Sequence, residues 1–257
     1  MGLELSGRFG MDIQGVKGSF MEKIKSEKSM EGPTGGLFVV GTPIGNLGDF
    51  SDRAKEILNR ADVVLAEDTR KTGRFLADIG IKKPMISCPD FNEDKRIADV
   101  LSHLQRGHLV CLVSDAGMPT ISDPGFRIVR AVVAQGFRVS GIPGPSAVLL
   151  ALAISGLPTD RFIFDGFFPR KPGKAKSVAL SYLQETRTIL FFESPHRIAK
   201  TLAILCEILG DNRQVVIARE LTKTYEEVIR GPIAKVIAST QDRQWLGEIT
   251  VVLAGAD

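Results

Sequence analysis

Apolar residues between positions 37 and 155 occur in short continuous runs that alternate with segments of helical periodicity. The runs are bounded by Gly, Pro, Asp or Ser, which is typical of buried strands. They predict strands over residues 37–40, 62–68, 109–114 and 137–142. The segments with apolar residues three and four apart predict helices over residues 51–60, 69–80, 93–107, 126–136 and 146–155. This alternation predicts a mostly parallel sheet covered by helices on both faces.

The pattern changes after the segment GLPTDRF, residues 156–162, where turn-forming residues are dense. Beyond it the apolar runs predict strands over residues 161–168, 188–193, 214–220, 225–231 and 248–255. The intervening segments predict a basic loop over 169–176, helices over 178–185 and 198–209, and a short helix beginning at Pro232. Short connections between consecutive strands indicate a mixed sheet. We therefore predict an α/β fold with two α/β domains, residues 36–157 and 158–257.

Residues 1–35 mix charged residues, glycines and methionines without sustained periodicity. A segment of this kind cannot bury enough apolar surface to offset the entropy of ordering it. We therefore expect a flexible N-terminal arm that precedes the two domains.

Composition narrows the class of protein. The chain has 257 residues, of which 44% are hydrophobic and 25% are charged, as in a globular enzyme. The formal charge of +3 allows a polyanionic partner without requiring one. Three widely separated cysteines and no histidines at metal-ligand spacing predict neither a disulfide framework nor a metal site. The longest apolar run, AVLLALAISGL, is too short to span a bilayer, so we expect a cytoplasmic protein without a membrane partner.

Common nucleotide-binding and hydrolase motifs do not fit the spacing of this chain. The glycines after the first strand, Gly41, Gly45 and Gly48, lack the G-x-G-x-x-G spacing of a dinucleotide-binding loop. Gly173-Lys174 is followed by Ala rather than by the Ser or Thr of a P-loop, and GPSAV lacks the second glycine of a nucleophile elbow. Ordinary nucleotide and hydrolase chemistry is therefore not favoured.

Six polar loops rich in Gly and Pro directly follow predicted strands: GTPIGN, EDTRKT, SDAGMPTISDPG, IPGPSA, ESPHR and RELTK. Ligands of open α/β sheets bind at the carboxyl ends of the strands, where such loops converge. Each loop alone could equally be a turn. Together they predict one site for a compact molecule that is bound largely by main-chain groups. Asp115 is a carboxylate at such a strand end and could pair with a cationic group of the ligand, or could serve only as a helix cap.

Six longer motifs, GTPIGNLGD, AEDTRKT, SDAGMPTISDPG, PGPSA, FFESPHRI and ARELTKTYEE, together resemble the tetrapyrrole methylase family, and within it the branch that methylates ribosomal RNA. The resemblance extends from Leu37 to Gly255. It implies a two-domain α/β methyltransferase, not Rossmann-like, that binds S-adenosylmethionine in a cleft between the domains, usually as a homodimer. The implied reaction is 2'-O-ribose methylation of a cytidine in the decoding region of 16S (small-subunit) ribosomal RNA, and the implied partner is that RNA or the assembled subunit.

The resemblance also implies which loops hold the cofactor. The glycine-proline loop after the first strand, the acidic loop beginning at Ser114, the PGPSA turn and the ends of two strands in the second domain would surround it. The implied cofactor-binding residues are Thr42, Pro43, Asp115, Ala116, Gly117, Ser146, Ala147, Phe192, Glu193 and Ala218.

Transfer of a methyl group to a ribose hydroxyl needs in-line positioning and a proton acceptor. Among the charged strand ends we favour Glu67 or Glu220 as the base, with His196 as second choice, although each could instead be part of an ion-paired strand end. Basic residues in two segments are candidates for binding RNA phosphates, or else a solvated surface: Arg70, Lys71, Arg170, Lys171, Lys174 and Lys176. The neighbouring Phe167 and Phe168 could stack on a base or belong to the core.

Two other functions compete with this interpretation. The first is methylation of a porphyrin or corrin precursor on the same fold, and the second is non-catalytic RNA binding during ribosome assembly. The tetrapyrrole-modifying relatives carry a different first loop and Gly-Asp-Pro in place of Ser114-Asp115-Ala116, which favours RNA as the substrate. Binding of S-adenosylmethionine would separate an enzyme from an assembly protein.

Overall fold

The computed structural model describes residues 35–89, 93–241 and 243–256, and Gly35–Asp257 form one compact unit. The predicted flexible arm, residues 1–35, lies outside the described residues apart from Gly35. The described residues contain two five-stranded sheets with helices packed on them, in agreement with the predicted α/β class. Among these residues no helix is both long and apolar enough to cross a membrane.

The first sheet is entirely parallel and has the strand order β3-β2-β4-β1-β5. Its strands are β1 (Gly36–Val40), β2 (Val63–Ala66), β3 (Met85–Ser87), β4 (Leu109–Val113) and β5 (Val139–Ile142). The parallel sheet and four of its strands were predicted. The edge strand β3 was not, because three residues are too few to produce a periodic pattern.

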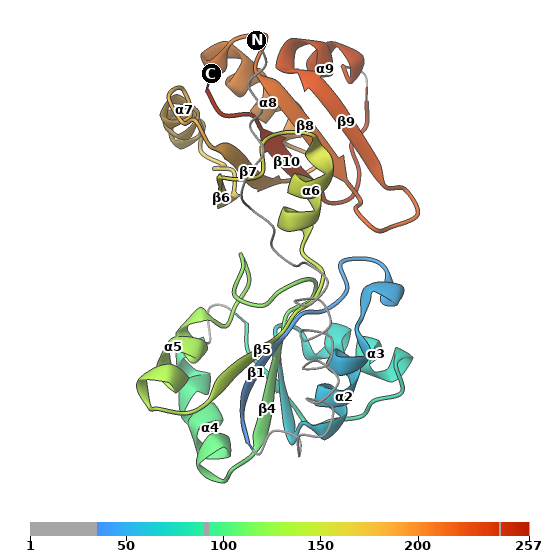
Figure 1. Cartoon of the computed structure of the whole chain (residues 1–257), viewed down its shortest axis with the longest axis vertical. Coiled ribbons are helices and arrows are strands. Elements are labelled where there is room, and N and C mark those ends of the chain that lie inside the picture. The colour runs from blue at the N-terminus through green and yellow to red at the C-terminus, as the bar shows by residue number, and fades with distance from the viewer. Residues whose placement is uncertain (1–34, 90–92, 242, 257) are drawn as a thin grey trace, which may run out of the picture. The chain divides into compact units, whose positions relative to one another are not determined.

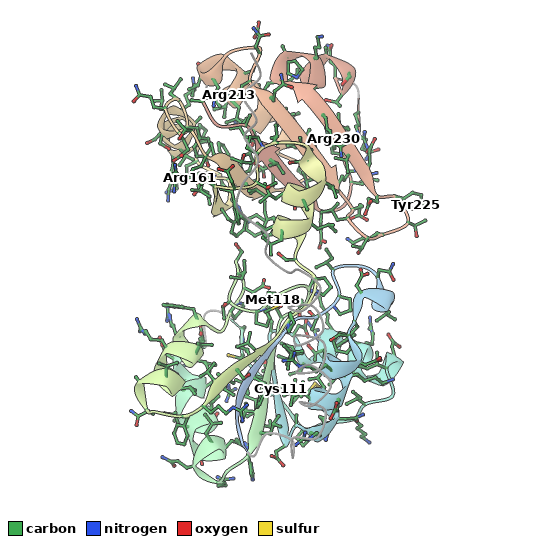
Figure 2. All side chains as sticks on the ribbon, in the orientation of Figure 1. Cys111, Met118, Arg161, Arg213, Tyr225 and Arg230 are labelled. Carbon is green, nitrogen blue, oxygen red and sulfur yellow. The ribbon has the colours of Figure 1, made fainter. Side chains whose placement is uncertain are left out.

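Helices cover both faces of this sheet (Figure 1), as predicted. On one face lie α2 (Asp52–Arg60) and α3 (Thr69–Asp78), preceded by a short 3-10 helix over Leu47–Asp49. On the other face lie α4 (Glu93–Gln105) and α5 (Phe126–Ala134). Because both faces are covered, β2 and β4 are buried along their whole length. Cys111 lies within this core (Figure 2), as expected for a small buried residue.

The second sheet is mixed, as predicted, and has the order β6-β7-β10-β8-β9. Its strands are β6 (Phe162–Phe167), β7 (Thr188–Glu193), β8 (Gln214–Arg219), β9 (Glu227–Pro232) and β10 (Ile249–Leu253). Only the β6–β7 pair is parallel. The helices α7 (Pro172–Ser181), α8 (Ile198–Leu209) and α9 (Ile233–Ser239) share one core with this sheet, whereas α6 (Ala147–Ser155) contributes to a separate core on its other face.

Two details of the second half differ from, or go beyond, the predicted pattern. The predicted basic loop 169–176 is wrong in its second half, because α7 begins at Pro172 and contains Lys174 and Lys176. Proline suits the first turn of a helix, where its missing N–H costs nothing. Helix α6 precedes the predicted domain boundary at residues 157 and 158 and yet packs on the second sheet. That boundary stays a prediction.

Candidate functional site

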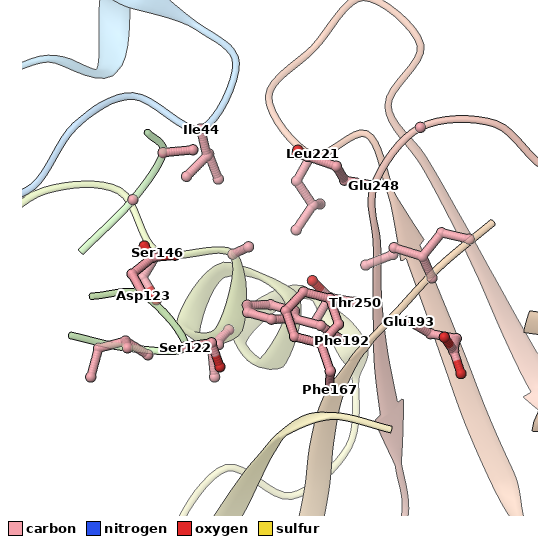
Figure 3. Close-up of a pocket in the computed structure, with 18 of the residues that line it drawn as sticks. Ile44, Ser122, Asp123, Ser146, Phe167, Phe192, Glu193, Leu221, Glu248 and Thr250 are labelled. Atoms are coloured by element: carbon pink, nitrogen blue, oxygen red, sulfur yellow. The ribbon is translucent and has the colours of Figure 1, made fainter. Parts of the chain in front are cut away.

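A cavity of about 320 Å³ lies where loops from both sheets meet (Figure 3). This volume is within the range of sites for small molecules, about 300 to 1,000 Å³. Its wall combines apolar side chains such as Ile44 and Leu221 with small residues and a few polar groups. Most of the predicted cofactor-binding residues line it, namely Ala116, Gly117, Ser146, Ala147, Phe192, Glu193 and Ala218. The strand-end loops that were singled out from the sequence therefore include several that share one cavity.

Two glycines bring the loops after β1 and β5 into backbone contact. A Cβ atom at Gly41 would lie 2.6 Å from the Cα of Gly144 and 2.7 Å from the Sδ of Met118, which also lines the cavity. A Cβ atom at Gly144 would in turn lie 2.7 Å from the Cα of Gly41. Carbon atoms in contact are normally 3.5 to 4.0 Å apart. Both motifs therefore need glycine here so that the second loop can continue directly into Ser146 at the cavity.

The loops after β1 and β4 are joined by a short antiparallel bridge. The N–H of Thr42 donates to the carbonyl of Gly117 over 2.9 Å, and the N–H of Gly117 donates to the carbonyl of Thr42 over 3.1 Å. The Thr42 hydroxyl also donates to the carbonyl of Ser114 at 3.2 Å. Thr42 is buried and, like the neighbouring Pro43, does not line the cavity. The contacts of Thr42 position Gly117, which does.

Asp115 does not line the cavity either. Its Oδ2 is 2.7 Å from the Nζ of Lys71, and its Oδ1 accepts from the N–H of Asp68 over 3.3 Å. This hydrogen bond raises the pKa of Lys71, because the Asp115 carboxylate stabilises the ammonium form. Asp115 therefore ties the loop after β4 to the start of α3. Its predicted contact with the cofactor stays a prediction.

Helix α6 presents its N-terminus to the cavity. Ser146 is the N-cap, and its Oγ accepts from the N–H of Leu149 over 3.4 Å. The first N–H groups of a helix have no acceptor within the helix, and the helix dipole favours a negative charge beside them. Ala147 and Val148 carry these groups and line the cavity. An anionic part of a ligand would be stabilised at this end of the site.

The end of β7 supplies an aromatic wall. The ring of Phe192 lies 5.0 Å from that of Phe164 and 5.4 Å from that of Phe167. Phe167 lines the cavity and is 61% exposed, whereas Phe168 is only 2% exposed and belongs to the core. Of the two phenylalanines that could stack on a base, only Phe167 is therefore accessible to one.

Glu193 lines the same wall, but protein groups already occupy its carboxylate. Its Oε1 accepts from the N–H of Ser194 at 2.5 Å and pairs with Arg197, and its Oε2 accepts from the hydroxyl of Thr201 at 2.6 Å. The side chain is fully buried. A buried carboxylate is tolerated only when it is paired and hydrogen-bonded in this way. Glu193 thus fixes the turn after β7 and leaves Phe192 to contact a ligand.

None of the three residues favoured as the base lines the cavity. Glu220 accepts from the Nζ of Lys223 at 2.8 Å and from the N–H of Glu248 at 2.9 Å. Burial raises the pKa of Glu220, but these hydrogen bonds outweigh it and the pKa is lowered overall. His196 is exposed, and Glu67 is half-buried at the end of β2. These three assignments stay predictions.

A carboxylate that sequence reasoning missed, Asp123, does line the cavity. Burial raises its pKa to about 6, and the charges of Glu67 and Asp115 act in the same direction, against a hydrogen bond with Ser114 that lowers it. Asp123 lies in the motif SDAGMPTISDPG, where it resembles a turn-forming residue before Pro and Gly. Its place in the longest strand-end loop is the only sequence signal that could have drawn attention to it.

Backbone strain is concentrated beside the cavity. Four non-glycine residues among those described have positive φ angles: Thr120, Ser122, Glu220 and Thr222. They lie in the loops 118–125 and 220–222, which also contribute Ser122 and Leu221 to the cavity wall. The hydroxyl of Thr222 is buried without a hydrogen-bond partner in the described part of the chain. Strained backbone and unpaired buried polar atoms are typical of functional sites, where a ligand or motion compensates for them.

The basic residues predicted to bind RNA fall into two groups. Arg70 pairs with Asp68, Lys71 with Asp115, and Lys176 with Glu207 at 2.7 Å. Within the described residues, the other three form no ion pair: Arg170, Lys171 and Lys174.

Arg170 also lines a smaller pocket of about 140 Å³. Two further cationic side chains, Arg197 and Lys200, contribute to its wall. Arg197 is held by the carbonyl of Phe168 and by Glu193, whereas Lys200 is exposed on α8. Sequence reasoning did not include Lys200, because it lies on a helix distant in sequence from the basic segment. The described residues contain no group of three or more metal-ligating side chains.

A small-molecule cavity at the carboxyl ends of a parallel sheet, closed by loops of a mixed sheet, defines an α/β protein with a ligand-binding cleft. Residues 36–237 match the model of the family described as Tetrapyrrole (Corrin/Porphyrin) Methylases. The chain belongs to this family, as its motifs predicted.

Relatives and solved structures agree with this assignment. The chain is 48% identical over 224 residues to the ribosomal RNA small subunit methyltransferase I of Thermotoga maritima, covering 87% of this chain and 100% of the relative. It is 41% identical over 235 residues to the protein of that name in Escherichia coli O157:H7, covering 90% and 82%. The methyltransferase CobJ aligns with a TM-score of 0.64 at 19% identity, covering 87% of this chain and 95% of its own. The uroporphyrin-III-C-methyltransferase of Thermus thermophilus aligns with a TM-score of 0.59 at 17% identity, covering 86% and 92%. The two solved structures share the fold.

Proposed function

We propose that this protein is an S-adenosylmethionine-dependent methyltransferase that methylates the 2'-hydroxyl of a cytidine in the decoding region of 16S ribosomal RNA. The observation that carries the proposal is the cavity itself, because residues from several of the sequence motifs, from Gly117 to Ala218, line it together. The relatives that are 41% and 48% identical, both named ribosomal RNA small subunit methyltransferase I, support RNA as the substrate.

The lining of the cavity supports S-adenosylmethionine as the proposed ligand. Apolar side chains of Ile44, Phe192 and Leu221 can enclose the adenine, since flat apolar groups favour such walls. The N-terminus of α6 can hold the carboxylate of the methionine part. The carboxylate of Glu248, which also lines the cavity, complements a ligand that carries a sulfonium and an ammonium group. The bound cofactor would supply an activated methyl group, while the residues of the chain bind it and exclude water.

RNA is proposed to reach the cavity past the start of α7. Arg170, Lys171 and Lys174 form no ion pair within the described residues and are therefore available to phosphates without first breaking one. Phosphate neutralisation of this kind makes binding depend on salt. The exposed ring of Phe167 stands at the cavity wall and can stack on a base. Lys176, which is paired with Glu207, is expected to contribute less.

Methylation of a porphyrin or corrin precursor is the second candidate function. The solved structures with tetrapyrrole names support it, but at 17% and 19% identity they show only the fold. Residues 114–117 read SDAG, whereas the tetrapyrrole-modifying relatives carry Gly-Asp-Pro at this position, and this difference favours RNA as the substrate. The family resemblance also leads us to propose a homodimer that works in the cytoplasm. Light scattering of the purified protein measures whether it is a dimer.

The proposal is tested with purified protein, deuterium-labelled S-adenosylmethionine and small ribosomal subunits from cells that lack the corresponding gene. Nucleosides from the digested RNA are separated and weighed by mass spectrometry. Labelled 2'-O-methylcytidine is expected, and naked 16S RNA and uroporphyrinogen are tested in parallel. Label in the tetrapyrrole alone would replace the proposal with its alternative. Binding to subunits without any transfer, and without heat on titration with S-adenosylmethionine, would indicate an assembly protein.

In the same assay, the triple substitution of Arg170, Lys171 and Lys174 with Ala is expected to raise the half-saturating subunit concentration about 10-fold or more and to reduce its salt dependence. Lys176→Ala is the matched control, because Lys176 lies on the same helix as Lys174 but is already paired with Glu207. A triple variant that loses turnover while keeping its affinity for subunits would show that these cations do not grip the RNA.

A further inference from the structure

We propose that Asp123 is the catalytic base of this site and accepts the proton of the hydroxyl that is methylated. The inference rests on the proposed function and assigns to it a residue that neither the family resemblance nor the charged strand ends indicated. A base must reach the reacting atoms, so the candidates are the carboxylates that line the cavity.

Three carboxylates line the cavity within the described residues, and two of them are unsuited to the role. Glu193 is fully buried, and Arg197, Thr201 and the Ser194 N–H occupy its oxygens. Glu248 is 75% exposed, and its Oε2 lies 3.1 Å from the Nζ of Lys223. The oxygens of Glu193 are thus already taken up by protein groups, and Glu248 is held by Lys223 and faces solvent. Neither carboxylate is free to accept a hydrogen bond from a substrate hydroxyl inside the cavity.

Asp123 has the opposite environment. It is half-buried, and no cationic side chain within the described residues forms an ion pair with it. The charged groups that act on it, Glu67 from the end of β2 and Asp115 from the end of β4, are both acidic. Lys71, a cation near this cluster, forms an ion pair with Asp115 at 2.7 Å rather than with Asp123. Desolvation and like charges both favour the protonated form, so Asp123 binds a proton more readily than an ordinary aspartate.

The loop that carries Asp123 is held in a demanding conformation. Thr120 and Ser122 have φ angles of 74° and 61°, and Gly125 has a φ of 123°. Buried Glu93 fixes the end of the loop, because its Oε1 accepts from the N–H of Gly125 at 3.1 Å and from that of Ile128 at 3.0 Å. Because its end is anchored, the loop keeps this strained backbone and holds Asp123 at the cavity. Figure 3 shows Asp123 among the side chains that surround the cavity.

The chemical step balances with Asp123 in this role. The 2'-oxygen of the ribose forms a bond to the methyl carbon while the bond between that carbon and the sulfonium sulfur breaks, and the electron pair of the broken bond stays on sulfur. The hydroxyl proton passes to a carboxylate oxygen of Asp123 and then to solvent. The sulfur loses its positive charge and the ribose gains a neutral ether, so the step balances without an oxidant or reductant. A base whose proton affinity is near the working pH serves such a step best.

The test is single-turnover methylation of small subunits by wild type, Asp123→Asn, Asp123→Glu and the control Asp160→Asn, an exposed residue away from the cavity. Asp123→Asn is expected to slow transfer about 100- to 10,000-fold, as is typical for removal of a base. Its dissociation constant for S-adenosylmethionine, measured by calorimetry, should stay within about 3-fold of wild type. Asp123→Glu should recover part of the rate. The wild-type rate should rise with pH with a midpoint at or below about 6, and Asp123→Asn should lose this dependence.

Two results would overturn the inference while leaving the proposed function intact. In the first, wild type and Asp123→Asn transfer the methyl group at similar rates. In the second, Asp123→Asn loses affinity for the cofactor by 10-fold or more, which would make Asp123 a ligand of the cofactor rather than a base. Failure of the wild-type enzyme to methylate any ribose would instead defeat the proposed function, and this inference with it.

Discussion

Replacing Gly41 with Ala tests whether the backbone contact between the loops after β1 and β5 builds the site. The new methyl group would lie 2.6 Å from the Cα and 2.8 Å from the N of Gly144, and 2.7 Å from the Sδ of Met118. The methionine side chain can rotate away, but the backbone of Gly144 cannot move without its loop. The loop must therefore retreat by about 1 Å to reach the normal contact distance of carbon atoms.

The size of the effect follows from this overlap. Overpacking of a close contact costs about 1 to 3 kcal/mol of the free energy of unfolding. Ser146 and Ala147 are joined to Gly144 through Pro145 alone and line the cavity, so they are expected to move with it. A displacement of about 1 Å at a reacting site can reduce the rate about 100-fold. Gly41→Ala should thus lose both stability and methyl transfer, each by an amount that is easily measured.

Gly141→Ala is the matched control, because Gly141 lies in β5, close to Gly144, and a Cβ atom there meets nothing within 4 Å. Urea unfolding followed through the single tryptophan, Trp245, measures stability, and single-turnover transfer to small subunits measures the rate of methylation. The control should unfold at the same urea concentration as wild type or slightly above it. If Gly41→Ala behaves like the control in both measurements, the contact between the loops does not shape the cavity.

Three further outcomes are expected. Glu93→Ala removes the acceptor of two backbone N–H groups at the start of α5 and should lower the free energy of unfolding by about 2 to 4 kcal/mol. Glu93→Gln keeps an acceptor and should lower it by about 1 kcal/mol or less. Equal losses for the two variants in urea unfolding would contradict this explanation. As the pH rises from about 4 to about 6, wild type should lose free energy of unfolding relative to Asp123→Asn. Burial raises the pKa of the native Asp123 carboxyl, which therefore keeps a proton that the unfolded chain has lost. A difference between the two proteins that stays constant with pH would refute the raised pKa. Burial raises the pKa of Cys88 to about 11 and of Cys111 to about 12, so a thiol reagent should modify the less buried Cys206 first, as mass spectrometry of the peptides would show.

The order and type of most elements could be predicted because their apolar patterns are long and regular. The parallel sheet followed from alternating runs such as 109–114, and the mixed sheet from short connections such as the one between β8 and β9. The start of α7 was missed because Lys171, Pro172 and Gly173 look like a loop when they are considered singly. Proline is in fact well suited to the first helical position.

The sequence predicted the cavity-lining residues whose place depends on main-chain geometry. It did not predict those whose role depends on the charges around them. Gly117 and Ser146 lie in motifs whose glycines and caps are visible in the sequence. Asp115 and Asp123 belong to the same loop and have the same side chain, so only their neighbours distinguish them. Lys71 comes to Asp115 from a helix 44 positions away, whereas Asp123 faces the cavity and two acidic groups. The raised pKa of Asp123 and the ion pair of Asp115 both arise from tertiary contacts, which no local pattern records.

The strand order of the first sheet constrains how the chain can assemble during synthesis. β1 emerges first among the described strands, yet both of its neighbours, β4 and β5, come much later, beginning with the pairing of Gly36 to Leu109. At about 5 to 20 residues per second, the ribosome needs several seconds to make the intervening roughly 70 residues. During that interval β1, an apolar interior strand, has neither of its partner strands. Its side chains can enter the core of the sheet only after β4 has been translated.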